Sequence, residues 1–249
     1  MSRPASPIRA TLAQLGVELR LTARRAENVL VTILIPMAVL LFFASVDVVA
    51  TAGERAVDFL LPGTLALAVI ASGLVNLGIA TAYERHYGVL KRLGGSPLTR
   101  TNLVTAKIGA VLVIEVIQSI LLISIAWLVL GWRPGPDGSA ALLLAILGLG
   151  TLTFAGLGLL LAGALRAEAT LALANGLFLV TMLLGGIVVP LDRLPEPVAA
   201  LAAWFPGAAL GEGFRIALGA SGDPLAAVVI LGAWGIAAAG LAIRTFRWE

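Results

Sequence analysis

The sequence predicts an all-α integral membrane protein, and three observations support this fold class. Hydrophobic residues make up 59% of the 249 residues, and the mean hydropathy is +1.02. Charged residues make up only 12% of the chain, against roughly 25% in ordinary soluble domains. The apolar residues also gather in six stretches, each close to the roughly 20 residues that a helix needs to cross a bilayer.

The predicted spans follow one another along the chain at residues 29–46, 59–82, 103–130, 140–165, 170–189 and 225–243. The fourth span carries several small residues, which favour close helix packing: Gly148, Gly150, Gly156, Gly158, Ala162 and Gly163. We expect a six-span transmembrane domain over residues 29–249, preceded by a separate N-terminal segment over residues 1–28.

The N-terminal segment has the pattern of an amphipathic helix. Ile8, Leu12, Leu15 and Leu19 recur at spacings of four, three and four, so they share one helical face. A helix of this kind lies in the membrane interface, and the first span follows immediately. A surface helix packed on protein is the alternative.

The basic residues predict the orientation, because cytoplasmic loops carry an excess of Lys and Arg. If the N-terminus is cytoplasmic, thirteen of the 17 Lys and Arg residues lie inside, and only Arg55, Arg133, Arg193 and Arg215 lie outside. The opposite orientation fits this asymmetry badly. We therefore expect a multi-pass protein of the cell membrane with both termini in the cytoplasm.

A basic segment, YERHYGVLKRLGGSPLTR, separates the second and third spans at residues 83–100. It is too polar to cross the bilayer and lies on the inner side in this topology. Gly94-Gly95 and the following Ser-Pro pair would end a helix that begins at Glu84, so we expect a helix of two or three turns. The segment could anchor the chain to lipid headgroups or contact another protein.

The loop between the fifth and sixth spans, residues 190–224, is long and partly apolar. Two prolines near its start suit a helix N-terminus, and residues 198–205 are apolar but too short to span. Pro206-Gly207 interrupts the stretch, and residues 208–218 could form a second short helix. Backbone at membrane depth survives only if protein covers it. We expect two short re-entrant helices that pack onto the bundle from outside.

Composition and motifs argue against several classes of enzyme. The chain has no Cys and one His, which excludes disulfides and a multi-histidine zinc site. Neither lysine stands in a P-loop, G-x-x-x-x-G-K-[ST], so ATP is not bound by that route. The pI near 9.9 does not indicate nucleic acid, because the basic residues flank apolar spans and form no continuous stripe. We expect a protein that is not an enzyme and holds no cofactor or metal.

A short motif, GASG at residues 219–222, resembles the serine motif of rhomboid intramembrane proteases. A serine nucleophile needs a base within hydrogen-bond reach. The sole histidine, His86, lies on the inner side, whereas Ser221 lies on the outer side in this topology. We therefore reject the protease interpretation.

Polar side chains inside the predicted spans include Asn76, Glu115, Gln118 and Asn175. Glu115 and Gln118 are three residues apart and form a small polar face with Ser119 in the third span. Ionisable groups inside a membrane often mark a substrate pathway or a conformational coupling. A carboxyl group bonded to a neighbouring helix is equally compatible, and interhelical hydrogen bonding is the simpler interpretation for the two asparagines.

Two motifs resemble those of ABC-2 type transporter permeases. These permeases carry a pattern close to E-R-x-x-G-x-L-x-x-L-x-x-[ST]-P-[LIV] after their second span, matched here by Glu84, Arg85, Gly88, Leu90, Leu93, Ser96, Pro97 and Leu98. His86 departs from the pattern, since many members have an acidic residue there. A second stretch resembles the segment after their fifth span, with the matching positions held by Pro190, Leu194, Pro195, Phe205, Pro206 and Arg215.

The resemblance covers nearly the whole chain and is greatest to antibiotic and drug efflux permeases of actinobacterial type. It implies the permease subunit of an ATP-binding cassette exporter in a bacterial membrane, forming the path for an amphipathic drug, antibiotic or lipid-like substrate. A separate pair of ATP-binding subunits would hold ATP and magnesium, and a second permease copy or a related permease would complete the transporter. A structural or assembly membrane protein without transport activity is the alternative function.

The resemblance also assigns expected roles to residues. The coupling helix within residues 83–100 would contact the ATP-binding subunit through Glu84, Arg85, Gly88, Leu90, Lys91, Leu93, Ser96 and Pro97. The short outer helices would close an outer gate that contains Pro190, Pro195, Phe205, Pro206 and Arg215. Membrane lipid would surround the spans.

Overall fold

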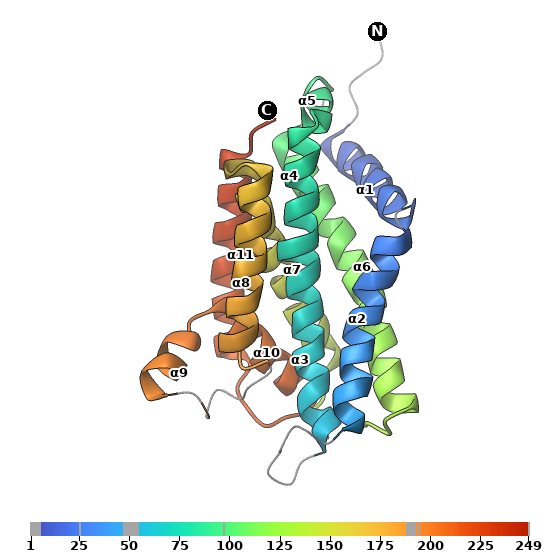
Figure 1. Cartoon of the computed structure of the whole chain (residues 1–249), viewed down its shortest axis with the longest axis vertical. Helices are drawn as coiled ribbons and strands as arrows, with labels where there is room; N and C mark the ends of the chain where they lie inside the picture. The colour runs from blue at the N-terminus through green and yellow to red at the C-terminus, as the bar shows by residue number, and fades with distance from the viewer. Residues whose placement is uncertain are drawn as a thin grey trace.

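The computed structural model describes residues 6–24, 26–46, 55–96, 98–187, 193 and 195–248, and in these residues every regular element is a helix. Figure 1 shows the long helices side by side in one bundle. The short helix α5 (Val89–Gly94) lies at one end, and the short helix α9 (Glu196–Ala202) lies at the other. These are called the α5 end and the α9 end below.

The remaining elements are α1 (Pro7–Arg24), α2 (Ala26–Ser45), α3 (Ala56–Ile70), the π-helix η1 (Ala71–Leu77), α4 (Gly78–His86), α6 (Arg100–Leu128), α7 (Ala140–Ala164), α8 (Ala167–Leu184), α10 (Pro206–Ala217) and α11 (Leu225–Thr245). Five described stretches are long and apolar enough to cross a membrane, namely α3 to α4 taken together, α6, α7, α8 and α11. The apolar part of α2 that is described, Thr32–Ser45, is shorter. The expected all-α, multi-pass membrane protein is confirmed at this level.

Helix α7 occupies the core of the bundle and contacts its neighbours at very short range. A Cβ atom added at Gly156 would lie 2.9 Å from the backbone nitrogen of Ala239 in α11. One added at Gly73 of η1 would lie 2.7 Å from the backbone nitrogen of Ala155 in α7. Only glycine allows backbones to approach this closely. Helix packing is therefore the role of Gly156, whereas Gly148 of the same helix has nothing within 4 Å of such a Cβ.

Helix α1 packs along α6, and part of its surface is buried there. Gln14 is buried, and Leu15 lies against Gly109 of α6. Ile8 and Leu12 are 73% and 59% exposed. The helix therefore contacts protein along a mixed face and presents its first apolar residues outward.

Helix α10 is the one short helix of the described chain that is almost wholly buried. It packs against α3, α7 and α11, with Leu210 and Phe214 at 0% exposure. The turn that leads into α7 joins its C-terminal end, since the backbone N–H of Ser139 donates to the carbonyl of Ala217 at 2.9 Å. The expected packing of this loop onto the bundle is found for α10, whereas Leu201 of α9 is 68% exposed.

Candidate functional site

The basic segment between α4 and α6 forms two helices instead of the single helix expected from Glu84. Helix α4 ends at His86, and α5 begins after Gly88, whose φ of 71° is left-handed. Such a φ strains any residue with a side chain, so Gly88 is required for the sharp turn. The chain therefore changes direction at Gly88, and α5 does not continue the axis of α4.

Helix α5 rests on an apolar support at the α5 end. Leu90 is 1% exposed and packs with Leu103 and Phe246, while Leu93 and Trp248 cover the same cluster. Leu90 therefore fixes α5 to its own bundle and does not face outward. The support explains how a helix of six residues can hold a defined position.

One surface of α5 and of the turn before it is open. It consists of His86, Tyr87, Val89, Lys91 and Arg92, all of them exposed, and is called the α5 surface below. Tyr87 is 70% exposed and stacks on Tyr83, with a ring distance of 6.1 Å. Ser96 is exposed too, and Pro97 lies outside the described residues. The motif singled out neither Tyr87 nor Val89, and only their position beside the glycine turn could have indicated them.

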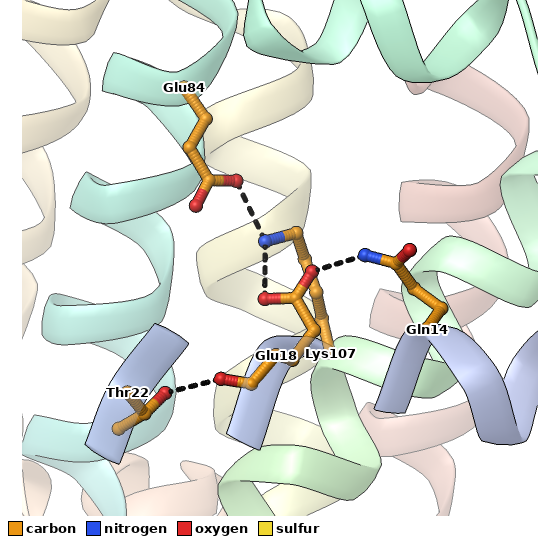
Figure 2. Close-up of polar contacts among 5 residues, drawn as sticks. All are labelled: Gln14, Glu18, Thr22, Glu84 and Lys107. Carbon is orange, nitrogen blue, oxygen red and sulfur yellow. Dashed lines mark hydrogen bonds and ion pairs between the residues drawn. The ribbon is translucent and has the colours of Figure 1, made fainter. Parts of the chain in front are cut away.

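Glu84 does not belong to this open surface, because it points into the bundle. Its Oε2 atom lies 2.8 Å from Nζ of Lys107 in α6, and Glu18 of α1 lies 3.1 Å from the same nitrogen. Figure 2 shows the three side chains meeting, with Gln14 and Thr22 bonded to Glu18. These five residues are called the Lys107 cluster.

The charged side chains of the Lys107 cluster are largely buried, and the ammonium group of Lys107 is paired with two carboxylates. The side chain of Lys107 is 2% exposed, and those of Glu18 and Glu84 are 12% and 16% exposed. Burying one ammonium group is costly unless carboxylates pair with it. The two carboxylates come from α1 and α4, so three helices distant in sequence are joined at one point. The sequence analysis did not single out Lys107, although a lone lysine within an apolar run indicates a buried carboxylate partner.

Arg85 also points inward and joins α4 to the turn between α7 and α8. Its guanidinium donates to the carbonyl oxygen of Gly163 at 2.6 Å and to that of Leu165. The last carbonyls of a helix have no partner within it, and a cationic donor there is favourable. Glu84 and Arg85, adjacent in the motif, thus fasten the end of α4 on two sides.

Inside the bundle, Gln118 supplies a hydrogen bond that a proline removes. Pro36 of α2 has no N–H, so the carbonyl of Thr32, four residues earlier, lacks its usual helical donor. The side-chain amide of Gln118 donates to that carbonyl at 2.7 Å. Asn76 of η1 donates to the hydroxyl of Thr32 at 3.2 Å. Three of the spans expected from the sequence therefore meet at Thr32.

The other predicted polar residues are placed differently. Glu115 is 1% exposed and accepts a hydrogen bond from the hydroxyl of Thr151 in α7. Its second carboxyl oxygen, like the amide oxygen of Gln118, has no partner among the described residues. Asn175 is exposed and donates to Leu171 of its own helix at 2.8 Å. Asn76, Glu115 and Gln118 thus lie in the α2, η1, α6 and α7 region, and Asn175 does not join them.

Arg215 is the one residue of the expected outer gate with several contacts between elements. It pairs with Glu212 at 2.8 Å, donates to the carbonyl of Gly186, and lies 5.4 Å from the ring of Phe59. It therefore joins α10 to the end of α8 and to the start of α3. Pro206 is buried at the first turn of α10, and Phe205 before it is 46% exposed. Pro195 precedes α9, and Pro190 lies outside the described residues.

In the described part of the chain, the one histidine lies far from Ser221. His86 ends α4 at the α5 end, whereas α10, which precedes Ser221, lies toward the α9 end (Figure 1). The arrangement instead has an open α5 surface, a buried charged cluster beneath it and a polar junction at Thr32.

A family model described as ABC-2 type transporter matches residues 11–218, which includes α5 and all of the helices from α2 to α10. No curated protein matches the sequence.

Proposed function

The chain belongs to the ABC-2 type transporter family, and from this premise we propose that it is the permease subunit of an ATP-binding cassette exporter. It forms the translocation path and leaves ATP hydrolysis, with ATP and magnesium, to a separate pair of ATP-binding subunits. A second copy of the chain, or a related permease, completes the path. The cargo is an amphipathic drug, antibiotic or lipid-like molecule, because a path wall with few fixed charges suits such a molecule better than an inorganic ion.

The proposed topology has six spans, with α2 as the first and both termini in the cytoplasm. The α5 end is then cytoplasmic, which fits its basic residues: Arg85, Lys91, Arg92, Arg100, Arg166, Arg244 and Arg247. Helices α9 and α10 lie on the outer side, where α10 is the re-entrant helix. Arg215 holds α10 against α3 and α8 and so supports the outer gate.

One observation carries the proposal: the α5 surface is open, while Glu84 and Arg85 directly behind it bind α6, the end of α7 and the turn after α7, and Lys107 extends the contact to α1. Helix α5 docks on the ATP-binding subunit through Lys91, Arg92 and the neighbouring Tyr87 and Val89. Closure of the ATP-binding subunits displaces α5 as a rigid body. The displacement reaches α1 and α6 through Lys107, and α7 and α8 through the carbonyls that Arg85 binds.

Copurification tests this function. Affinity-tagged chain is isolated from its native membrane in mild detergent, and bound proteins are identified by mass spectrometry. We expect a P-loop protein in the preparation, and ATP hydrolysis by the complex but not by the chain alone. A preparation that transports its cargo without any nucleotide-binding protein would contradict the proposal and favour a different class of membrane protein.

A further inference from the structure

A pocket of ≈ 420 Å³ opens at the α5 end, between the last turn of α4 and the first turn of α8. It is lined by Ala82, Arg85, His86, Arg166, Ala167 and Glu168. Neither the motif nor the Lys107 cluster accounts for it. Its walls combine apolar methyl groups with cationic groups, as expected at the depth where a bilayer meets water.

The pocket has an excess of positive charge without an internal partner. Among the described residues, Arg85 donates hydrogen bonds to neutral carbonyl groups. Arg247, which follows α11, is close enough for its positive charge to repel that of Arg85. Arg166 forms no ion pair with any described residue. Glu168 is the one carboxylate of the lining. Two guanidinium groups line the pocket against one carboxylate, with that of Arg247 nearby, and a bound anion would relieve the repulsion among the cationic groups.

The donors present are those that phosphate oxygens prefer. Arginine presents planar, bidentate donors to phosphate. Helix α8 begins at Ala167, and its first backbone N–H groups have no partner within the helix. These N–H groups point toward the N-terminal end of α8, which is the end that lines the pocket. Leu171 and Leu179 follow Glu168 at helical spacing along α8 and are 40% and 52% exposed. Exposed leucines thus follow the cationic pocket along α8, interrupted on the same face by the exposed Asn175, and they offer contacts for the acyl chains that follow a headgroup.

We propose that this pocket binds the phosphate-bearing headgroup of an anionic phospholipid, with its acyl chains along α8. Basic pockets between membrane helices are known to take such headgroups. The inference depends on the membrane location of the chain and not on transport or on an ATP-binding subunit, so it can fail while the proposed function holds. The same donors could take free phosphate or an acidic side chain of a partner protein, and the experiment separates these cases.

Native mass spectrometry of the purified chain tests the proposal directly. The chain in detergent micelles is titrated with phosphatidylglycerol and, separately, with phosphatidylcholine, for the unchanged protein, Arg166→Ala and Arg100→Ala. Arg100 is an exposed arginine at the start of α6 and does not line the pocket, so its variant controls for loss of surface charge. We expect tight retention of phosphatidylglycerol only, weakened about tenfold by Arg166→Ala and unchanged by Arg100→Ala. Arg166→Lys, which keeps the charge but loses the bidentate donors, should lie between.

Several results would overturn the proposal. If all variants retain phosphatidylglycerol equally, or if both alanine variants lose it equally, the lipid does not bind in this pocket and any retention reflects general surface charge. Retention of phosphatidylglycerol by neither the unchanged protein nor any variant would exclude a tight site. Displacement of the lipid by millimolar inorganic phosphate would assign the pocket to free phosphate. Loss of a copurifying protein from Arg166→Ala with lipid retention unchanged would assign it to protein docking. Thermal unfolding of each variant in detergent identifies any variant that has lost its fold; if Arg166→Ala has, Arg166→Lys compared with the unchanged protein decides the test.

Discussion

Lys107 Nζ lies 2.8 Å from Oε2 of Glu84, and the two residues join α6 to the end of α4 directly beneath the α5 surface. Glu18 of α1 completes the cluster at 3.1 Å. The contact gives a physical reason for the glutamate of the motif: it faces inward to hold α4, α6 and α1 together. A displacement of α5 therefore reaches helices that α5 itself does not touch.

Removal of the lysine charge should destabilise the fold. Lys107→Met leaves two largely buried carboxylates without compensation, and breaking a buried pair typically costs about 3–5 kcal/mol. We expect a lower unfolding temperature in detergent, and a partial recovery when Glu18→Gln and Glu84→Gln are added, because the cluster is then neutral. An unfolding temperature equal to that of the unchanged protein would mean that Lys107 reaches solvent.

Arg85 should matter for coupling more than for assembly. Arg85→Ala removes the donors to Gly163 and Leu165 but leaves the α5 surface intact. We expect the ATP-binding subunit to copurify normally, while cargo transport per ATP hydrolysed falls severalfold. Arg100→Ala, an exposed change on the same segment, is the matched control and should have no effect. Equal transport by the two variants would remove Arg85 from the path of coupling.

Gln118 and Pro36 should be energetically coupled. Gln118→Leu removes the side-chain donor to the Thr32 carbonyl, and losing a hydrogen bond of this kind typically costs about 1 kcal/mol. Pro36→Ala restores a backbone N–H four residues after Thr32. We expect the double variant to be more stable than Gln118→Leu alone, as measured by reversible unfolding in detergent and a double-mutant cycle. Strictly additive effects would show that the side chain does not replace the missing helical bond.

Two glycines of α7 should respond oppositely to the same change. Gly156→Ala would place a Cβ 2.9 Å from the backbone of α11, and overpacking of this kind typically costs about 1–3 kcal/mol. Gly148→Ala meets open space and should stabilise the helix by about 0.5–1 kcal/mol. The measurement is the unfolding midpoint of each variant under one denaturant. Similar shifts for both would contradict the close approach of α7 and α11.

The spans could be predicted from the sequence because apolar length and composition are sufficient in a bilayer. Helices α6, α7 and α11 begin and end within a few residues of the expected positions. The break at Gly88 was not expected, since a left-handed glycine between two short helices leaves no periodic signal. The residues of α1 that contact the bundle could not be predicted, because the contact includes an ion pair from Glu18 to a lysine 89 residues away.

The sequence predicted which segment contains the candidate site, but not which of its side chains face the bundle and which face outward. Glu84, Arg85 and Leu90 were all expected on the side of a partner, and all three face their own bundle. A pattern in sequence cannot distinguish residues that contact a partner from residues that support the contact, because both are needed at fixed spacing. Tyr87 and Val89, which are exposed, match no position of the pattern.

Cross-linking at the α5 surface tests the central claim most directly. The chain has no cysteine, so Val89→Cys carries the only thiol and can be labelled with a photoreactive maleimide in native membranes. Leu201→Cys in α9, which is also exposed but lies at the other end, is the control. We predict that position 89 captures a P-loop subunit, with a yield that changes when ATP is added, and that position 201 does not. Capture of lipid alone at position 89, in membranes where ATP-driven transport is intact, would contradict the account.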